Sequence, residues 1–502
     1  MVDVKEHRHR RAIVGTAQYG DAAVSGGDGP KGSEAGRGLA LLVAGAFFME
    51  NLDGTIISTA APDMAASFGV RPADIGVAMT AYFVALAVFI PVSGWAADRY
   101  GARRVFVRAI AVFTLASALC AAADGLPELV VMRVAQGIGG AMMVPVGRLA
   151  VLRSTRKPDL LRAIAWLTWP GLLAPVLAPA LGGLFTTYAS WHWIFLVNVP
   201  LGVLALPFAL RLVPDLRRTE RTRLDWVGFG AGGAGLAAVV LGLERFGDVP
   251  AAWGAGASWF TAGVALCLVT VRHFQLSPRP LLDLGALRVD TFRVSNAGGA
   301  LFRASITAVP FLLPLMFQGA FGWSAATAGL VLIAVFAGNV AVKPLTTPLL
   351  RRFGFRTVLL VNGVATAVTF VPCGLLGPHT PMAVVVSVLF MSGVCRSVSL
   401  SAYATIGFAD IEADRTSGAN ALSSTVQQLG VAFGALALHA AGPIAPLLGL
   451  AGPAAPYRVA FALLALLPLI TVAEAARLRR DAGAVVTGAA SAPVAGAGTA
   501  VR

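Results

Sequence analysis

Apolar segments of about 20 residues recur along this chain, separated by short polar stretches. An α-helix rises about 1.5 Å per residue, so each segment is long enough to cross a hydrocarbon layer of about 30 Å. The pattern therefore predicts an all-α polytopic membrane protein with fourteen transmembrane helices. Their approximate ranges are 39–59, 75–96, 105–123, 127–150, 162–185, 193–212, 226–244, 255–273, 293–317, 325–349, 357–376, 381–405, 418–441 and 457–476.

Composition agrees with this class, because 57% of the 502 residues are hydrophobic and only 13% are charged. The first 38 residues are polar and Gly-rich and contain no apolar stretch, so we expect no cleavable signal peptide. We expect this tail, and the Ala/Gly/Val-rich tail from about Asp481, to be disordered. The four cysteines fall inside predicted spans, where we expect neither a disulfide nor a metal site.

The basic residues decide the orientation. With the N-terminus in the cytoplasm, 31 of the 39 Lys and Arg residues fall in tails and loops placed inside, 5 within spans and 3 outside, namely Arg71, Arg245 and Arg458. This asymmetry predicts that both termini are cytoplasmic. A net charge of +14 would indicate nucleic acid in a soluble protein, but no basic patch is interleaved with aromatic residues, so we expect no nucleic-acid partner.

Charged residues inside the spans carry most of the chemical information. An unpaired charge at a helix centre costs roughly 2.5–3.5 kcal/mol on insertion scales. These residues must therefore pair with one another or line a wet cavity. They are Glu50, Asp53, Arg133, Arg303 and Arg396. Arg148 and Lys343 lie near predicted cytoplasmic helix ends, where we expect both side chains to snorkel.

Depth indicates which of these groups meet. At about 1.5 Å per residue, Asp53 and Arg133 lie at a similar level, roughly 21 Å from the cytoplasmic edge, so they can pair. Glu50 precedes Asp53 by three residues and shares its helical face, and Gln136 and Gly140 lie on one stripe with Arg133. A carboxylate in such a cavity can act as a proton switch. A permanently ionised structural pair is the alternative.

The chain also contains a degraded internal repeat, whose second copy we call the echo of the first. The segment ADRYGARRVFV at 97–107 is repeated in degraded form as LRRFGFRTVLL at 350–360, so that Gly101 matches Gly354. Arg351 stands where the first copy has Asp98. Two related halves around a midplane cavity are a common design of secondary transporters. Two sets of six spans plus an inserted pair, 226–244 and 255–273, account for all fourteen.

The first copy of this repeat resembles the signature loop of the major facilitator superfamily, formed here by Gly94, Asp98, Arg99, Gly101, Arg103 and Arg104. Other stretches resemble the 14-helix drug:proton antiporters of the QacA/EmrB type, most closely their MdtD-like branch. They are NLDGTIISTAAPDMA (51–65), RVAQGIGGAMMVPVGR (133–148), APVLAPALGG (174–183), SWHWIFLVNVPLG (190–202), FQGAFGWSAATAGL (317–330) and QQLG (427–430). Ala174 and Ala178 depart from the family's antiporter motif, where Gly is usual.

The resemblance implies two six-helix bundles, 39–212 and 293–476, with two inserted helices in 226–273 and cytoplasmic tails at 1–38 and 477–502. It implies a gating role for the charged turn and an antiporter motif formed by Pro175, Pro179, Gly182 and Gly183. We expect Gln136, Gly140, Arg303, Arg396 and Phe48 to line the substrate cavity. We expect Asp53, Glu50 and Arg133 to couple transport to protons.

The sequence thus predicts a monomeric, proton-driven efflux transporter of the bacterial inner membrane that needs no cofactor or metal. Its partners are a small-molecule substrate, protons and the lipid bilayer, and a periplasmic adaptor stays open. Drugs, toxic metabolites or other amphiphilic compounds are the expected substrates. Because Arg303 and Arg396 are expected to make one wall of the cavity basic, organic anions or metal chelates are an alternative class of substrate. A membrane enzyme or a sensor is less well supported, since we find no catalytic constellation, nucleotide-binding loop or soluble output domain.

Overall fold

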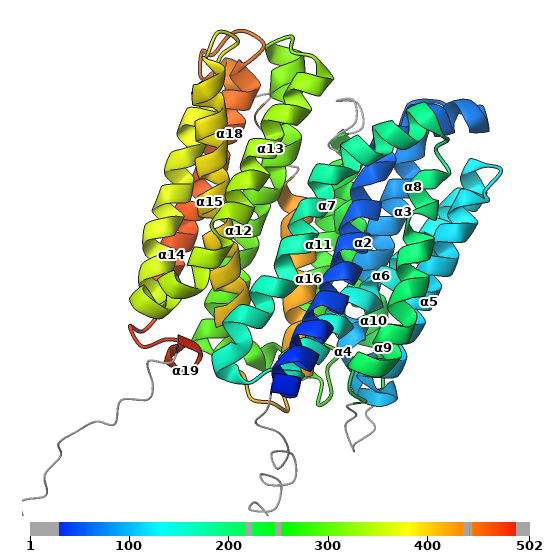
Figure 1. The fold of residues 1–502 in the computed structure, drawn as a ribbon, viewed down its shortest axis with the longest axis vertical. Helices are drawn as coiled ribbons and strands as arrows, with labels where there is room; N and C mark the ends of the chain where they lie inside the picture. Colours follow the sequence, from blue (N-terminus) through cyan, green and yellow to red (C-terminus); the bar gives the residue numbers. More distant parts are fainter. Residues whose placement is uncertain (1–29, 216–222, 246–252, 435–440, 442–443, 488–502) are drawn as a thin grey trace, which may run out of the picture.

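The computed structural model describes residues 30–215, 223–245, 253–434, 441 and 444–487, and the regular structure in these residues is helical. The first part of the chain forms one bundle of packed helices (Figure 1). Its elements are α2 (Pro30–Phe68), η1 (Pro72–Ile75), α3 (Gly76–Phe89), α4 (Val92–Tyr100), α5 (Ala102–Ala121), α6 (Leu126–Ser154), η2 (Lys157–Asp159), α7 (Leu160–Tyr188), α8 (Trp193–Leu196) and α9 (Asn198–Leu212).

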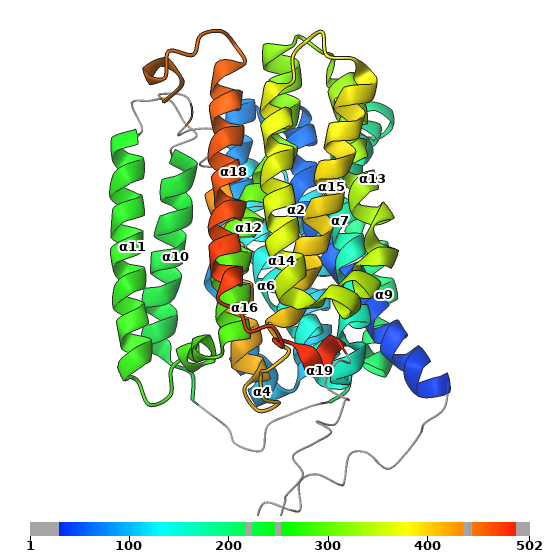
Figure 2. The ribbon, with the colours of Figure 1, turned by 90° about the vertical axis from the view of Figure 1, so that its left-hand side faces the viewer.

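The last part of the chain forms a second bundle beside the first (Figures 1 and 2). Its elements are η4 (Leu284–Arg288), α12 (Asp290–Leu315), the π-helical turn η5 (Met316–Ala320), α13 (Ala325–Ala341), α14 (Lys343–Leu375), α15 (Met382–Ile406), α16 (Thr416–Gly434), α18 (Ala455–Ala476) and α19 (Ala484–Thr487). Between the bundles in sequence lie α10 (Trp226–Arg245) and α11 (Trp253–Leu276). These two helices pack on each other, and α10 also packs on α3.

Ten helices of the described part are long and apolar enough to cross a membrane, and the bent pair of α3 and α4 raises this number to eleven. That pair is bent by 59°. The bend lies at Ile90 and Pro91, where the proline lacks an amide hydrogen and disturbs the regular helix. The sequence predicted a single span over 75–96, so this break was not foreseen.

The helices extend beyond the predicted spans at both ends of the chain. We expected disorder before residue 39, but residues 30–38 continue α2. Part of the C-terminal tail is also ordered, because residues 484–487 form α19, which packs against α14, α7 and η2. Residues 1–29 and 488–502, the remainder of the two predicted tails, lie outside the described residues. The start of α2 and α19 lie at the same end of the molecule, which we call the termini end (Figures 1 and 2).

The charged turn and its second copy interrupt the helical backbone in the same way. Gly101 has φ 90° between α4 and α5, and Gly354 has φ 72° within the kinked α14. Glycine adopts positive φ without the steric penalty that a Cβ brings, which permits both reversals. The match between Gly101 and Gly354 that the sequence predicted is therefore also a match of backbone conformation.

Candidate functional site

A buried polar cluster is centred on Asp53 of α2. The carboxylate is 0% exposed and pairs with Arg133 of α6, which is also 0% exposed. Gln136 Nε2 and Asn198 Nδ2 donate hydrogen bonds to Asp53 Oδ1 at 2.8 and 3.0 Å. Three helices, α2, α6 and α9, thus meet at one carboxylate. The pairing of Asp53 with Arg133 agrees with the prediction from helix depth.

A second layer of contacts fixes the groups that hold Asp53. Gln136 Oε1 accepts a hydrogen bond from the Arg133 guanidinium at 2.7 Å, and its Nε2 also donates to Ser117 Oγ at 2.7 Å. The Arg133 guanidinium lies over the Tyr82 ring, 4.3 Å from the ring centroid. Cation–π contact of this kind stabilises a desolvated guanidinium. Arg133 is therefore compensated by an acid and by an aromatic face.

Glu50 lies one helical turn before Asp53 on α2. Its backbone carbonyl accepts a hydrogen bond from the Tyr82 hydroxyl at 3.3 Å. Its buried Oε2 has no hydrogen-bond partner in the described part of the chain. Gly140 of α6 lies beside it, since a Cβ at Gly140 would be 3.6 Å from Glu50 Oε2. The structure thus brings Glu50 and Gly140 together, and an acid that forms no ion pair with a described residue lies one turn from the buried pair.

Other predicted site residues are placed differently. Phe48 is half-buried and packs against the apolar cluster that includes Leu52 and Ile56, so its role in the cavity stays a prediction. Gly182 of α7 faces α2 so closely that a Cβ there would clash with Thr59, whereas Gly183 faces open space. The side chains of Pro175 and Pro179 lie outside the described part of the structure.

The second bundle contributes two arginines that form no ion pair with an acid among the described residues. Arg396 of α15 is 6% exposed and donates a hydrogen bond to the Ile306 carbonyl of α12 at 2.7 Å. Its Nε and NH1 atoms have no hydrogen-bond partner among the described residues. Arg303 of α12 donates to Gln427 Oε1 of α16 at 2.9 Å. We expected both arginines near the midplane. Arg303 lies on α12, three residues before the carbonyl that accepts from Arg396.

Two cations that we expected to snorkel lie inside the protein instead. Lys343 Nζ donates to Ser401 Oγ at 2.8 Å and to Thr168 Oγ1 at 3.4 Å, and Thr168 belongs to the first bundle. The Arg148 guanidinium lies 5.0 Å from the centroid of the Phe408 ring, in the second bundle. The sequence did not indicate that these two side chains lie between the bundles, because the position of a residue along its helix does not reveal which neighbouring helix the residue faces.

The charged turn is organised by contacts beyond the turn itself. Asp98 pairs with Arg153 at the end of α6 at 2.9 Å, and Arg103 Nε donates to the Val213 carbonyl after α9 at 2.5 Å. The Arg99 guanidinium lies 5.7 Å from the Trp95 ring centroid, while Arg104 is exposed. The turn therefore ties α4, α5, α6 and α9 together at the termini end.

Hydrogen bonds between the bundles gather at this same end. Ser417 Oγ donates to the Gly94 carbonyl at 3.0 Å, and Asn420 Nδ2 donates to the Pro145 carbonyl at 2.8 Å. Lys157 Nζ donates to the Ala409 carbonyl, after the last turn of α15, at 2.6 Å. The two bundles diverge toward the opposite end (Figure 1). This conformation is held together at the termini end.

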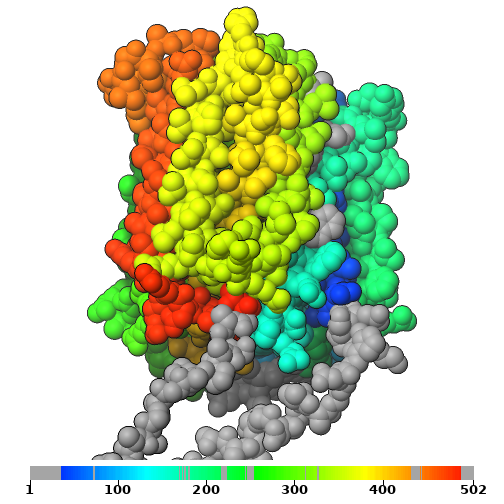
Figure 3. All heavy atoms as spheres, turned by 60° about the vertical axis from the view of Figure 1, so that its left-hand side comes forward, coloured from blue at the N-terminus to red at the C-terminus, as the bar shows by residue number. Residues whose placement is uncertain are grey.

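Close approach at Gly94 depends on its lack of a side chain. A Cβ there would lie 2.9 Å from the Ser417 carbonyl oxygen. The absence of a side chain at Gly94 therefore permits the contact between α4 and α16. The space-filling view shows α14 and α19 of the second bundle beside α7 of the first bundle along this end (Figure 3).

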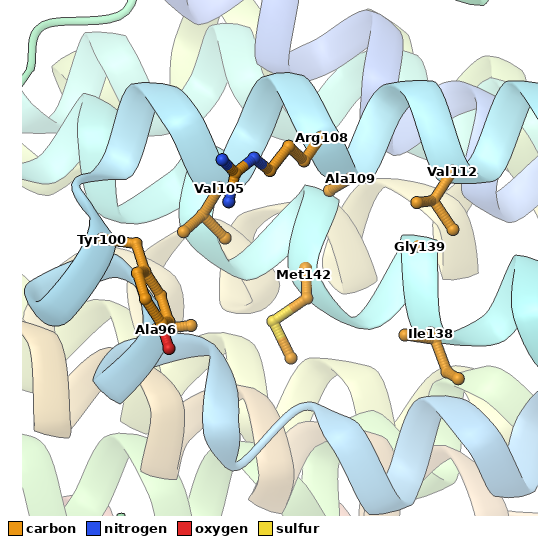
Figure 4. A pocket seen from close by; sticks show the side chains of 9 residues that line it. All are labelled: Ala96, Tyr100, Val105, Arg108, Ala109, Val112, Ile138, Gly139 and Met142. Atoms are coloured by element: carbon orange, nitrogen blue, oxygen red, sulfur yellow. The ribbon is translucent and has the colours of Figure 1, made fainter. Parts of the chain in front are cut away.

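A separate groove of about 210 Å³ lies on the other side of α6 (Figure 4). Gly139 faces it, whereas the neighbouring Gly140 faces Glu50. Apart from Arg108 and Tyr100 its lining is apolar. The lining residues are Ala96, Tyr100, Val105, Arg108, Ala109, Val112, Ile138, Gly139 and Met142. The groove does not reach the cluster around Asp53.

Comparison with known families identifies this arrangement. The profile of the Major Facilitator Superfamily matches residues 43–435 and 297–497. The chain belongs to this superfamily. It is 37% identical over 396 residues to the Escherichia coli protein named "Putative multidrug resistance protein MdtD", covering 78% of this chain and 83% of that protein. It is 35% identical over 402 residues to the Haemophilus influenzae "Probable transport protein HsrA", covering 80% and 87%.

Solved structures of the superfamily share the fold. The human organic anion transporter MFSD10 aligns with a TM-score of 0.59 at 15% identity, over 88% of this chain and 98% of that one. The proton:xylose symporter XylE also aligns with a TM-score of 0.59, at 14% identity, over 87% and 95%. The chain is therefore a multi-pass membrane transporter of small molecules with the major facilitator fold, and not an enzyme.

Proposed function

We propose that this transporter is a proton-coupled antiporter that exports drugs, toxic metabolites or other small amphiphilic compounds across the bacterial inner membrane. The observation that carries the proposal is the fully buried carboxylate of Asp53, held by Arg133, Gln136 and Asn198. Buried ionisable groups within membrane spans are costly and typically functional. The name of the Escherichia coli relative supports a drug-like substrate.

The proposed topology has fourteen crossings and both termini in the cytoplasm. Six crossings fall in 39–212, two in 226–273 and six in 293–476, with cytoplasmic tails at 1–38 and 477–502. In this scheme α13 and the first part of α14, up to Gly354, form one crossing, and the rest of α14 forms the next. The termini end is then cytoplasmic, in line with the basic residues of the charged turn.

The proton step uses the Asp53–Arg133 pair. A proton arriving on Asp53 cancels its charge and weakens its hold on Arg133, whereas loss of that proton restores the ion pair. Glu50, one turn away with an unpartnered Oε2, is a second acceptor in the same cluster. If the substrate binds more tightly to one protonation state, the proton changes the affinity for the substrate, and the substrate changes the affinity for the proton by the same factor.

Alternating access supplies the transport step. The cross-bundle hydrogen bonds of Ser417, Asn420 and Lys157 close the termini end in the conformation described above. The pair of Asp98 with Arg153 holds the adjoining helix ends in place. After substrate has left on the outer side, protonation from outside would favour the rocking that opens this end to the cytoplasm again. Each entering proton supplies about 2.3 kcal/mol per 100 mV of membrane potential.

Purified transporter in lipid vesicles tests this function. An imposed pH gradient should drive accumulation of at least one compound from a panel of cationic, zwitterionic, anionic and chelated compounds, and collapse of the gradient should abolish it. Empty vesicles are the control for passive partition. Transport that ignores the gradient for every compound would contradict proton coupling.

A further inference from the structure

The two bundles carry opposite charges at equivalent places of their first helices. Asp53 lies 48 residues before Gly101, and Ile306 lies 48 residues before Gly354. With the same offset, Glu50 of α2 corresponds to Arg303 of α12. The helix breaks support this alignment, because the bend at Ile90 corresponds to the start of α14 at residue 343.

The arginine of the first bundle also has a counterpart in the second. Arg133 of α6 contacts α2 at Asp53, and Arg396 of α15 contacts α12 at Ile306. The difference lies in the acceptor, since Ile306 offers only its backbone carbonyl. Arg396 is 6% exposed and keeps two nitrogen atoms without a hydrogen-bond partner in the described residues. The second bundle therefore retains the arginine of the pair and lacks the acid.

Three further cations of the described part of the chain likewise contact neutral groups. Arg303 is hydrogen-bonded to the neutral side chain of Gln427, and the Arg148 guanidinium lies against the Phe408 ring. Lys343 contacts two hydroxyl groups. Within the described ranges, none of these cations forms an ion pair with an acid. Asp53 is already neutralised by Arg133, whereas Glu50 beside it has a buried Oε2 without a hydrogen-bond partner among the described residues.

Arg303 belongs to α12, and the α12 carbonyl that accepts from Arg396 is that of Ile306, three residues after Arg303. The two arginines are therefore attached to α12 within one helical turn. Guanidinium groups recognise carboxylates through paired N–H···O hydrogen bonds. A cationic compound would instead be repelled by these two guanidinium groups. We propose that the transported compound is an organic anion whose carboxylate binds to Arg303 and Arg396 and fills the acceptor position that Ile306 leaves vacant. This inference rests on the proposed transport function and specifies its substrate class.

Binding of three matched probes tests the proposal. Dansylglycine, its neutral amide dansylglycinamide and the cationic dansylethylenediamine share one fluorophore and differ in terminal charge. Fluorescence titration of the full-length protein in lipid nanodiscs should show dansylglycine binding about tenfold or more tightly than the other two, since hydrogen bonds to charged groups contribute most to recognition. Equal affinities for the three probes, tighter binding of the cation, or no binding of any probe would overturn the proposal.

Substitution at Ile306 separates charge from shape. Ile306→Asp places an acid beside Arg396 and should weaken dansylglycine binding about tenfold or more, whereas Ile306→Asn, of nearly equal size, should retain it. Undiminished binding in Ile306→Asp, or equal losses in both variants, would contradict the proposal. Melting temperatures of both variants show that they are folded.

A second pair of variants guards against misfolding at Ile306. Arg303→Gln should lose anion affinity, and Arg272→Gln, at an exposed position of α11, should not. Retained affinity in Arg303→Gln would refute the role of this arginine. These titrations need no gradient, so anion binding without gradient-driven transport would count against the proposed function alone. Gradient-driven transport of other compounds without anion binding would count against the substrate class alone.

Discussion

Asp53 and Arg133 form an ion pair in which neither side chain is exposed, and Gln136 is hydrogen-bonded to both partners. The pair joins α2 to α6 at the centre of the first bundle. Removing one partner of a buried pair strands the other charge, while removing both does not. The same geometry therefore determines both the stability of the bundle and its response to a proton.

The first prediction concerns stability. Arg133→Leu should destabilise the protein by about 3–5 kcal/mol, because the Asp53 carboxylate is left buried and unpaired. The double variant Asp53→Leu/Arg133→Leu should cost less than the single one. Unfolding free energies in detergent, arranged as a double-mutant cycle, measure this difference. Additive losses would show that the two side chains do not act as a pair.

The second prediction concerns the charged turn. Asp98→Asn removes the acid that pairs with Arg153 and should lower the transport rate about five- to thirtyfold, as expected for a loss of 1–2 kcal/mol in one conformation. Membrane abundance should stay normal. Asp74→Asn, in the exposed pair with Arg71, is the matched control. Wild-type efflux in Asp98→Asn would exclude the gating role.

The third prediction concerns closure at the termini end. Asn420→Ala removes the hydrogen bond to the Pro145 carbonyl and should favour opening by about 1 kcal/mol. Spin labels at the exposed positions Arg156 and Asp414 report the separation of the bundles. The longer distances should gain about fivefold in relative population. Thr405→Ala, which removes a hydrogen bond within α15, should leave the distances unchanged, and the same result for Asn420→Ala would contradict the proposed closure.

The fourth prediction concerns the reversal at Gly101. Gly101→Ala places a Cβ at φ 90° and should cost about 1–2 kcal/mol, a penalty typical of left-handed backbone. Gly45→Ala, in the middle of α2 with open space around the added carbon, should be neutral or stabilising. Melting temperatures of both variants compare these effects. An equal response would show that backbone conformation at Gly101 is unimportant.

The fifth prediction concerns pH. Asp225 precedes α10, and although burial acts to raise its pKa, hydrogen bonds from Gly228 N, His273 and Leu281 N lower the pKa below its ordinary value. The stabilisation is therefore present above about pH 4 and is lost as the pH falls through the lowered pKa. Asp225→Asn should melt earlier than wild type at pH 7, and the difference should shrink in acid. A constant difference would contradict this linkage.

Sequence periodicity and helix depth predicted much of this structure. The apolar runs located the helices, and the equal depth of Asp53 and Arg133 predicted their contact, because both depend on helical rise alone. Asn198 was missed, although a polar residue at the start of an apolar helix in SWHWIFLVNVPLG was the available signal. Ser117 was also missed, because a single serine in an apolar helix does not by itself indicate a polar cluster.

Contacts between the bundles were beyond the sequence. Lys343 and Arg148 were expected to snorkel, but they lie against Thr168 and Phe408 across the interface. Which neighbour a helix face meets depends on how the two bundles pack, and one sequence contains no direct record of this.

Within the first bundle, the contact of Asp98 with Arg153 joins positions 55 residues apart, so the charges of the turn alone did not identify the partner.

Transport by the Asp53→Asn variant, measured once with a pH gradient and once without one, tests the proton-coupling role of Asp53 most directly. In vesicles, exchange of substrate across the membrane without a gradient should stay within about twofold of wild type, because Asn keeps an oxygen that can accept from Arg133. Accumulation driven by a pH gradient should fall to the level of empty vesicles. Gradient-driven accumulation equal to wild type in Asp53→Asn would contradict the proposal that this carboxylate carries the coupling proton.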